Sequence, residues 1–119
     1  MNDYVYHAAD ANGRKRDWYC LDVLTGQAPI ERIYEDELVL AFHHPRPEAP
    51  VHAVIIPKTH TPSLLGPEAL DSVLLVAMVN AVQEVARRLK IGREGLTLIA
   101  NAGAPGVTPH MHWHVRSPL

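Results

Sequence analysis

The sequence ends in a short segment in which histidines alternate with apolar residues. The segment is His110-Met111-His112-Trp113-His114-Val115. Alternation with a period of two is typical of a half-buried β-strand, so we expect the imidazoles on one face and the apolar side chains in a core. Imidazole titrates near neutral pH and can act as nucleophile, proton carrier, anion contact or metal ligand. We therefore interpret residues 110–115 as the strand that carries the chemistry.

The spacing along such a strand favours a phosphate over a single metal ion as the ligand of all three imidazoles. Alternate Cα atoms lie roughly 6.5 Å apart and the outer pair about 13 Å apart. Two neighbouring rings can share one tetrahedral metal with bonds of about 2 Å, but three rings can hardly do so. A phosphate can be attacked by one ring while the others donate hydrogen bonds to its oxygens. The attacking ring needs one unprotonated nitrogen, with the other held by an acceptor such as a backbone carbonyl, and this favours the central His112.

The loop before this strand contains groups that suit a phosphate site. Asn101 follows an expected strand at residues 96–100, where its amide can hydrogen-bond a ligand. Gly103 and Gly106 allow close backbone approach and can direct N–H groups at an anion. An ordinary tight turn is the alternative interpretation of the loop taken by itself.

The elements that position these residues follow an α+β pattern. The patterns predict a short helix at 18–24, a hairpin of 32–34 and 38–43, a strand at 53–56, a long helix at 67–89 and strands at 96–100 and 110–115. This order predicts an antiparallel sheet of about five strands with one long and one short helix. The long helix is apolar on two sides, which suggests its own sheet and a symmetry mate as partners. We expect residues 1–16 to form an arm and residues 17–119 to form a single domain.

The composition is that of an ordinary globular protein of 119 residues, with 47% hydrophobic and 20% charged residues. A formal charge of −2, with no basic stripe beyond residues 14–16, gives no reason to expect nucleic-acid binding. The longest strongly apolar run, residues 73–79, is too short to span a bilayer, and the first residues lack a signal-peptide pattern. A single cysteine, Cys20, fits a reducing compartment. We expect a cytoplasmic protein that binds neither nucleic acid nor membranes.

Further segments resemble the motifs of the histidine triad (HIT) superfamily and occur in the same order. They are Ile33-Tyr34-Glu35-Asp36, Leu40-Ala41-Phe42, Ala49-Pro50-Val51-His52, Ile55-Ile56-Pro57-Lys58 with His60, and Asn101-Ala102-Gly103. The resemblance covers nearly the whole chain and is nearest to the Hint-like branch. It implies a HIT-like fold.

Members of that superfamily hydrolyse or transfer nucleoside monophosphate groups through a covalent nucleotidyl-histidine. The resemblance implies a homodimer, no metal in the chemistry, His112 as the nucleophile, His114 and His110 as phosphate contacts, and an assisting Asn101. The positions that it implies for nucleotide binding are Phe42, His43, His44, His52, Gly103 and Thr108. From the residues alone, Phe42 can instead be plain core and His52 a satisfied histidine at the start of a strand.

The chain departs from the pattern of the superfamily at several positions. His44 stands where many Hint-like proteins have an acidic residue that bonds the ribose hydroxyls, so we expect altered nucleoside selection. The loop before the triad offers only Thr108 in place of a Gln-Ser/Thr pair, which predicts a changed leaving-group preference, since a departing amine must be protonated.

Some bacterial relatives hold a structural zinc with a Cys-x-x-Cys pair and two histidines. Here an aspartate replaces the first cysteine, so the corresponding set is Asp17, Cys20, His60 and His110. Carboxylate oxygen is an acceptable zinc ligand, and these residues could form a weakened site. The alternative is that Cys20 is a small buried apolar residue of the short helix.

The leading hypothesis is a nucleoside phosphoramidase or related nucleotide hydrolase that needs no cofactor. The second is a dinucleoside polyphosphate hydrolase of the Fhit-like branch, which Arg116 favours because a cation there can meet extra phosphates. A non-catalytic nucleotide-binding HIT protein is the third, motivated by His44 and the altered loop. A metal-binding module is the last.

Overall fold

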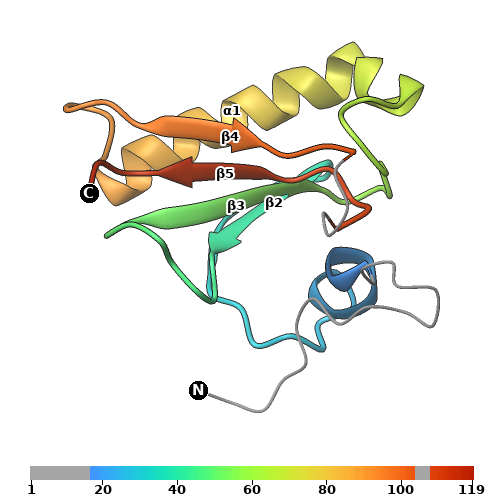
Figure 1. Cartoon of the computed structure of the whole chain (residues 1–119), viewed down its shortest axis with the longest axis horizontal. Helices are drawn as coiled ribbons and strands as arrows, with labels where there is room; N and C mark the ends of the chain where they lie inside the picture. The colour runs from blue at the N-terminus through green and yellow to red at the C-terminus, as the bar shows by residue number, and fades with distance from the viewer. Residues whose placement is uncertain (1–16, 104–107) are drawn as a thin grey trace.

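The structure is a computed structural model that describes residues 17–103 and 108–119. The expected arm at residues 1–16 and the loop glycine Gly106 lie outside these residues. In chain order the elements are η1 (Tyr19–Val23), β1 (Arg32–Glu35), β2 (Val39–His43), β3 (His52–Pro57), η2 (Pro67–Leu70), α1 (Ser72–Leu89), β4 (Thr97–Ala100) and β5 (Trp113–Arg116) (Figure 1).

The strands form one five-stranded sheet in the order β1-β2-β3-β5-β4, and every neighbouring pair is antiparallel. This confirms the predicted α+β fold with an antiparallel sheet. The predicted hairpin of β1 and β2 is also present, and Asp36 shapes its turn. The carboxylate of Asp36 accepts hydrogen bonds from the backbone N–H groups of Leu38 at 2.8 Å and Val39 at 2.9 Å, as is common for aspartate in turns.

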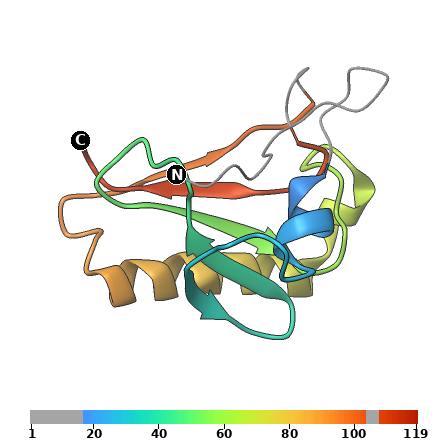
Figure 2. The ribbon, with the colours of Figure 1, turned by 90° about the horizontal axis from the view of Figure 1, so that it is seen from below.

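The two faces of the sheet carry different layers, because successive side chains of a strand point to opposite sides. On one face, α1 packs with its buried residues Leu74, Met78, Ala81 and Val85 on a core that includes Ile55. On the other face, Trp18, Tyr19 and Val23 of the η1 region cover Phe42 and Val54. Figures 1 and 2 show α1 running along the sheet and η1 near the end where β5 begins.

The long helix begins later than the sequence pattern predicted. Residues Pro67–Leu70 form a separate 3-10 turn, and α1 starts at Ser72. Asp71 separates the two, because its backbone is extended (φ −66°, ψ 110°) and its side chain accepts hydrogen bonds from Val73 and Leu74 N–H. This is the usual role of aspartate at an N-cap.

The short N-terminal helix is present as the five-residue π-helix Tyr19–Val23. The backbone N–H of Leu24 donates to the carbonyl of Tyr19 at 2.8 Å. The chain then turns at Gly26, whose φ is +82°. A positive φ suits glycine, and it ends the helix where the sequence predicted.

The histidine segment is a strand only in its second half. The strand β5 covers Trp113–Arg116, so His110 and His112 precede it, which corrects the prediction of a strand over residues 110–115. The reason lies in the backbone hydrogen bonds, since the N–H of Met111 donates to Thr61 and that of His110 to Thr108. The predicted alternation of side chains still holds, because Met111, Trp113 and Val115 enter the core beside α1.

In the part of the chain that the structure describes, no helix is long and apolar enough to cross a membrane.

Candidate active site

Four buried imidazoles lie on the face of the sheet that η1 covers. His52, His110, His112 and His114 are each at most 8% exposed. The ring centroids of His112 and His114 are 5.2 Å apart, and those of His52 and His114 are 5.0 Å apart. Buried polar groups need hydrogen-bond partners, so the partners of these rings determine which nitrogen carries a proton.

His112 has the protonation pattern that a nucleophile requires. Its Nδ1 lies 2.6 Å from the carbonyl oxygen of His110. A carbonyl oxygen only accepts, so Nδ1 carries the proton, and in the neutral ring Nε2 keeps a lone pair. The ring also packs against Tyr19, with centroids 5.0 Å apart. From the sequence we expect an acceptor such as a backbone carbonyl next to the central ring, and in the structure this acceptor is the carbonyl of His110.

A chain of hydrogen bonds fixes the tautomer of His114. The backbone N–H of Glu48 donates to His52 Nδ1 at 3.1 Å, so the proton of the neutral His52 ring is on Nε2. His52 Nε2 lies 2.8 Å from His114 Nδ1 and therefore donates to it. The remaining proton of His114 is then on Nε2. We call the sequence Glu48 N–H, His52 and His114 the relay.

Burial keeps His114 neutral as well. The pKa of His114 is lowered to about 3. Burial is the largest cause, followed by electrostatic repulsion from the positive charges of His112, His52, His44 and Arg116. The pKa of His52 is also lowered, mainly by burial and then by Arg116. His114 is thus a neutral hydrogen-bond donor at physiological pH, since a cationic ring would need a proton on the nitrogen that accepts from His52.

The ring of His110 is occupied elsewhere. It is fully buried, its Nε2 donates to the carbonyl of Pro57 at 3.0 Å, and its Nδ1 lies 3.1 Å from both Asp17 Oδ2 and Cys20 Sγ. Both ring nitrogens therefore face protein atoms. The phosphate contact that the resemblance implied for His110 has no free ring nitrogen, and its carbonyl serves His112 instead.

Asp17, Cys20, His60 and His110 form a compact group that we call the donor cluster. Asp17 Oδ2 lies 2.9 Å from His60 Nδ1 and 3.1 Å from His110 Nδ1, and Cys20 Sγ lies 3.3 Å and 3.1 Å from the same two nitrogens. A tetrahedral zinc with bonds of about 2.0–2.3 Å separates its ligands by about 3.3–3.6 Å. The donor cluster therefore fits one such ion after an expansion of a few tenths of an ångström.

The surroundings of the donor cluster also suit a metal. His110 Nε2, the ring nitrogen that does not face the donor cluster, donates to the carbonyl of Pro57. Most metal-binding histidines donate their other ring nitrogen to an acceptor in this way. Burial alone would raise the pKa of Asp17, but the hydrogen bonds from His110 and the Cys20 N–H prevail and lower it. Burial and then Asp17 raise the pKa of the Cys20 thiol to about 12. An ion must therefore displace the thiol proton in order to bind.

A second imidazole group, His44, His52 and His114, is less suited to a metal. The candidate ligand atoms lie within 4.8 Å of one another. However, the rings of His44 and His52 are stacked at 4.3 Å and 17°, so their in-plane lone pairs run nearly parallel instead of converging. Both nitrogens of His52 are also committed to the relay. The hydrogen bonds account for this group without an ion.

The other predicted nucleotide contacts are distributed unevenly. Phe42 is fully buried against Trp18 and Tyr19, which is the core role given as its alternative. His52 is the satisfied histidine at the start of β3. His43 pairs with Ala53, a residue of the core beside α1, so its side chain starts from the face opposite the imidazoles.

Of the groups predicted to lie near the phosphate, the strand pairing places Asn101 beside His112. Ala100 pairs with Trp113, so the next positions, Asn101 and His112, adjoin at the end of the ladder. Gly103 has a φ of +75°, and Thr108 is buried before the histidine segment.

Comparison with known proteins identifies the family. The model of the HIT domain matches residues 25–118. The chain belongs to the HIT family. Its relatives include a HIT-like protein of Synechocystis, 36% identical over 94 residues, which are 78% of this chain and 82% of that protein. A HIT-like protein of Azospirillum brasilense is 34% identical over 96 residues, 78% of this chain and 79% of that protein.

Solved structures of HIT proteins have the same fold. A HIT family hydrolase from Clostridium thermocellum superposes with a TM-score of 0.74 at 33% identity, covering 82% of this chain and 86% of that one. A Zn-bound histidine triad family protein from Mycobacterium smegmatis superposes with a TM-score of 0.66 at 32% identity, covering 80% and 70%.

Sequence reasoning missed three groups of this HIT site. Glu48 and Pro57 act through the main chain, as donor to His52 and acceptor from His110, and no side-chain pattern signals such contacts. Tyr19 of η1 packs on the ring of His112, although the two residues are 93 positions apart in the sequence. Its place in an apolar stretch of a short helix signalled burial but not its neighbour.

Proposed function

We propose that this HIT protein is a nucleotide-binding hydrolase or transferase that cleaves nucleoside 5′-phosphoramidates or related nucleoside monophosphate conjugates through a covalent intermediate on His112. The observation that carries the proposal is the hydrogen bond from His112 Nδ1–H to the His110 carbonyl. It leaves the lone pair on Nε2, which is the electron pair that a nucleophile needs.

The reaction proceeds in two displacements. His112 Nε2 attacks phosphorus, and the bond to the leaving group breaks as that group departs with its electrons and a proton from water. The positive charge that develops on the His112 ring is stabilised by the carbonyl that accepts its Nδ1 proton. Water then attacks phosphorus, and the P–N bond breaks with its electron pair returning to His112 Nε2. The attacking water gives its proton to solvent, which replaces the proton taken up by the leaving group, and the nucleoside monophosphate is released.

His114 and the relay hold the phosphate oxygens in this scheme. His114 presents Nε2–H as a neutral donor because its other nitrogen accepts from His52. A neutral donor can bond a non-bridging oxygen without forming a fixed ion pair in the ground state, so its hydrogen bond can strengthen as charge develops. Asn101 supplies an amide at the neighbouring position.

One observation favours a dinucleoside polyphosphate as the second candidate substrate. Arg116 lies two residues after His114 on β5 and pairs with Glu48, the first residue of the relay, at 3.1 Å. A substrate with additional phosphates could take the place of the Glu48 carboxylate on this guanidinium. A nucleotide-binding protein without catalysis remains the third hypothesis, motivated by His44.

The experiment measures AMP release from an adenosine phosphoramidate and, separately, from a diadenosine polyphosphate. We expect the wild type to release AMP from the phosphoramidate and to form an adenylylated protein that intact-mass measurement detects. His112→Ala should show neither. Gln83→Ala, on the exposed side of α1, is the control. Release from the polyphosphate alone favours the second candidate, and AMP binding without turnover of either substrate refutes the enzyme proposal.

We also propose that the donor cluster binds a structural zinc ion. The four donors and the acceptor behind His110 support this, as does the Zn-bound HIT relative. Such an ion, when bound, would link the start of η1 to the segment before β5. Equilibrium dialysis after chelation should give one zinc per chain in the wild type and a large loss of affinity in Cys20→Ser. Equal affinities of the two proteins would refute the assignment.

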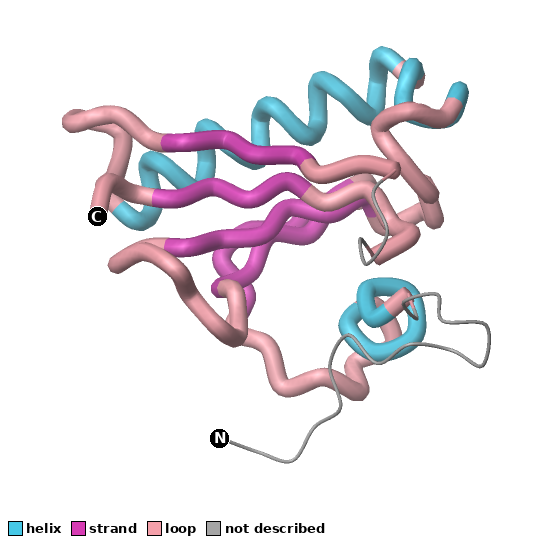
Figure 3. The backbone as a smooth tube through the Cα atoms, in the orientation of Figure 1, coloured by secondary structure: helices cyan, strands magenta, loops and turns pink. Residues whose placement is uncertain are grey.

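The apolar surface beside α1 supports a homodimer as the third part of the proposal. Leu70 of η2 and Val73 and Val76 of α1 are 81%, 66% and 70% exposed, and Leu98 of β4 is 46% exposed. The strand β4 lies at the edge of the sheet, uppermost among the strands in Figure 3. A second copy that pairs along this surface would bury all four side chains. Light scattering should report a dimer for the wild type and a monomer for Val76→Glu, and a monomeric wild type would refute it.

A further inference from the structure

His110 takes part in both polar centres of the protein. Its side chain belongs to the donor cluster, with Nδ1 3.1 Å from Asp17 Oδ2 and from Cys20 Sγ. Its main-chain carbonyl accepts the Nδ1 proton of His112 at 2.6 Å. The same residue therefore meets the donor cluster through its ring and the nucleophile through its backbone.

We propose that Asp17 is a positioning residue for His112, and that it acts through His110 when the donor cluster holds a divalent metal ion. The inference rests on the proposed role of His112 as the nucleophile. It assigns to the donor cluster a control of the chemistry in addition to a structural role.

The geometry gives this control its physical basis. His110 is fully buried and its ring is fixed on one side by the carbonyl of Pro57. On the other side its Nδ1 has two competing neighbours at the same distance, Asp17 Oδ2 and Cys20 Sγ. Without an ion, two contacts share this side of the ring. An ion held by the four donors would fix this side of the ring, and the carbonyl of the same residue would then be held more firmly toward His112.

Asp17 is the member that joins the donor cluster together. One carboxylate oxygen contacts both His60 and His110, while the other accepts the backbone N–H of Cys20 at 3.0 Å. An amide at position 17 would lose the anionic oxygen that both imidazoles share. A thiolate at this position would restore an anionic donor, so Asp17→Asn and Asp17→Cys separate charge from size.

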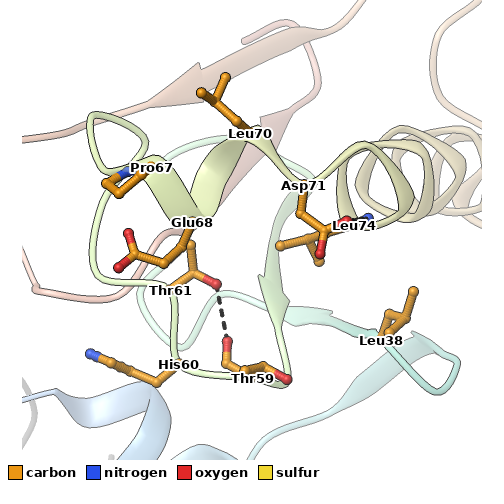
Figure 4. Close-up of a pocket in the computed structure, with 9 residues that line it drawn as sticks. All are labelled: Leu38, Thr59, His60, Thr61, Pro67, Glu68, Leu70, Asp71 and Leu74. Carbon is orange, nitrogen blue, oxygen red and sulfur yellow. Dashed lines mark hydrogen bonds between the residues drawn. The ribbon is translucent and has the colours of Figure 1, made fainter.

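The donor cluster is accessible to an ion from solvent. The side chain of His60 is 49% exposed, and His60 also lines a cavity of about 570 Å³ beside η2. Figure 4 shows His60 at the rim of this cavity, with its ring turned away from Leu38 and Leu74. An ion in an accessible site can exchange with solvent, so the position of the nucleophile can depend on the metal concentration. An ion in a fully enclosed site does not exchange in this way.

The test uses the full-length protein with histidine rings labelled with ¹⁵N, after chelation and after addition of one equivalent of Zn²⁺. The readouts are the solvent exchange of the His112 Nδ1 proton by NMR, and kcat and KM for AMP release. In the wild type we expect Zn²⁺ to slow this exchange and to raise kcat by about 2- to 10-fold, the value of one well-formed hydrogen bond, with little change in KM. Asp17→Cys should keep both responses, Asp17→Asn should lose them, and the exposed control Glu37→Gln should match the wild type.

Zinc that binds without changing the exchange of the His112 proton overturns the proposal, because the ion then only braces the fold. Failure of the wild type to bind zinc overturns it as well. If zinc slows the exchange in the wild type and in Asp17→Cys but neither releases AMP, the link from Asp17 to His112 is supported and the proposed reaction fails. The proton readout therefore separates the two conclusions.

Discussion

The relay predicts a specific dependence of stability on pH, which His114→Asn should reduce. In the folded protein the pKa of His114 is lowered to about 3, mainly by burial, while the unfolded chain has the ordinary value near 6.5. Below pH 6.5 the unfolded state therefore binds a proton that the folded state does not take up. The stabilisation from the neutral ring is complete above pH 6.5 and is lost as the pH falls toward 3.

The magnitude follows from proton linkage. One group that is protonated only in the unfolded state changes the free energy of unfolding by about 1.4 kcal/mol per pH unit. The unfolded imidazole is only half protonated at pH 6.5, so between pH 6.5 and 5.0 His114 should cost about 1.6 kcal/mol of stability. His52, whose pKa is also lowered by burial, adds a loss of the same sign. The carboxylate of Asp17 contributes only below its ordinary value of 3.8, outside this window.

The assay is urea unfolding from pH 5.0 to 7.5 at one protein concentration with a chelator, followed by the fluorescence of Trp18 and Trp113. We expect the mean slope of the unfolding free energy between pH 5.0 and 6.5 to fall by about 1.1 kcal/mol per pH unit in His114→Asn. Asparagine keeps an oxygen that can accept from His52 Nε2–H, and Gln83→Ala should keep the wild-type slope. If His114→Asn and the wild type have equal slopes, the folded imidazole takes up protons as readily as the unfolded chain, and the reasoning about the relay is wrong.

Further predictions concern the framework and the donor cluster. Asp71→Ala removes the N-cap of α1 and should lower the free energy of unfolding by about 1 kcal/mol in urea titrations; an unchanged midpoint would contradict the capping role. Met78→Ala empties a fully buried site beneath α1 and should cost about 2–5 kcal/mol by the same measurement. Gly26→Ala and Gly103→Ala both place a side chain at positive φ, and each should lower the free energy of unfolding by about 1 kcal/mol. A Cβ at position 103 would also lie 2.9 Å from Leu65, and this contact would account for any larger loss in Gly103→Ala. Burial and Asp17 raise the pKa of the Cys20 thiol to about 12, so zinc must displace its proton in order to bind. Zinc affinity measured by calorimetry should therefore rise about tenfold per pH unit from pH 6 to 8. An affinity that does not depend on pH would exclude Cys20 as a thiolate ligand.

Much of the fold was predictable because its signals are local. The alternation in the histidine segment placed Met111, Trp113 and Val115 in the core, and the structure confirms that side-chain pattern. The order of strands and one long helix predicted the antiparallel sheet. The boundaries were less predictable, because they depend on competition between local groups. Asp71 prefers to cap a helix, so α1 begins after it and Pro67 opens only a short turn.

The sequence by itself determined which chemistry is present and on which face of the sheet it lies. Residue type supplies the imidazoles, and the period of two sends them to the side opposite the apolar residues. These properties require no knowledge of distant contacts.

Only the tertiary structure decided what each imidazole does. His110, His112 and His114 are equivalent in sequence pattern, but each meets different partners. His110 meets Asp17 and Pro57 and His114 meets His52, all from distant segments. His112 meets the carbonyl of His110, two residues before it, and the ring of Tyr19 from η1. A neutral imidazole has one proton and two nitrogens, and the acceptor beside it selects the nitrogen that keeps the proton. The hydrogen-bond partners of His110 and His114 are 53 to 93 positions away and are set by packing, so the roles of these two histidines appear only once the chain is folded.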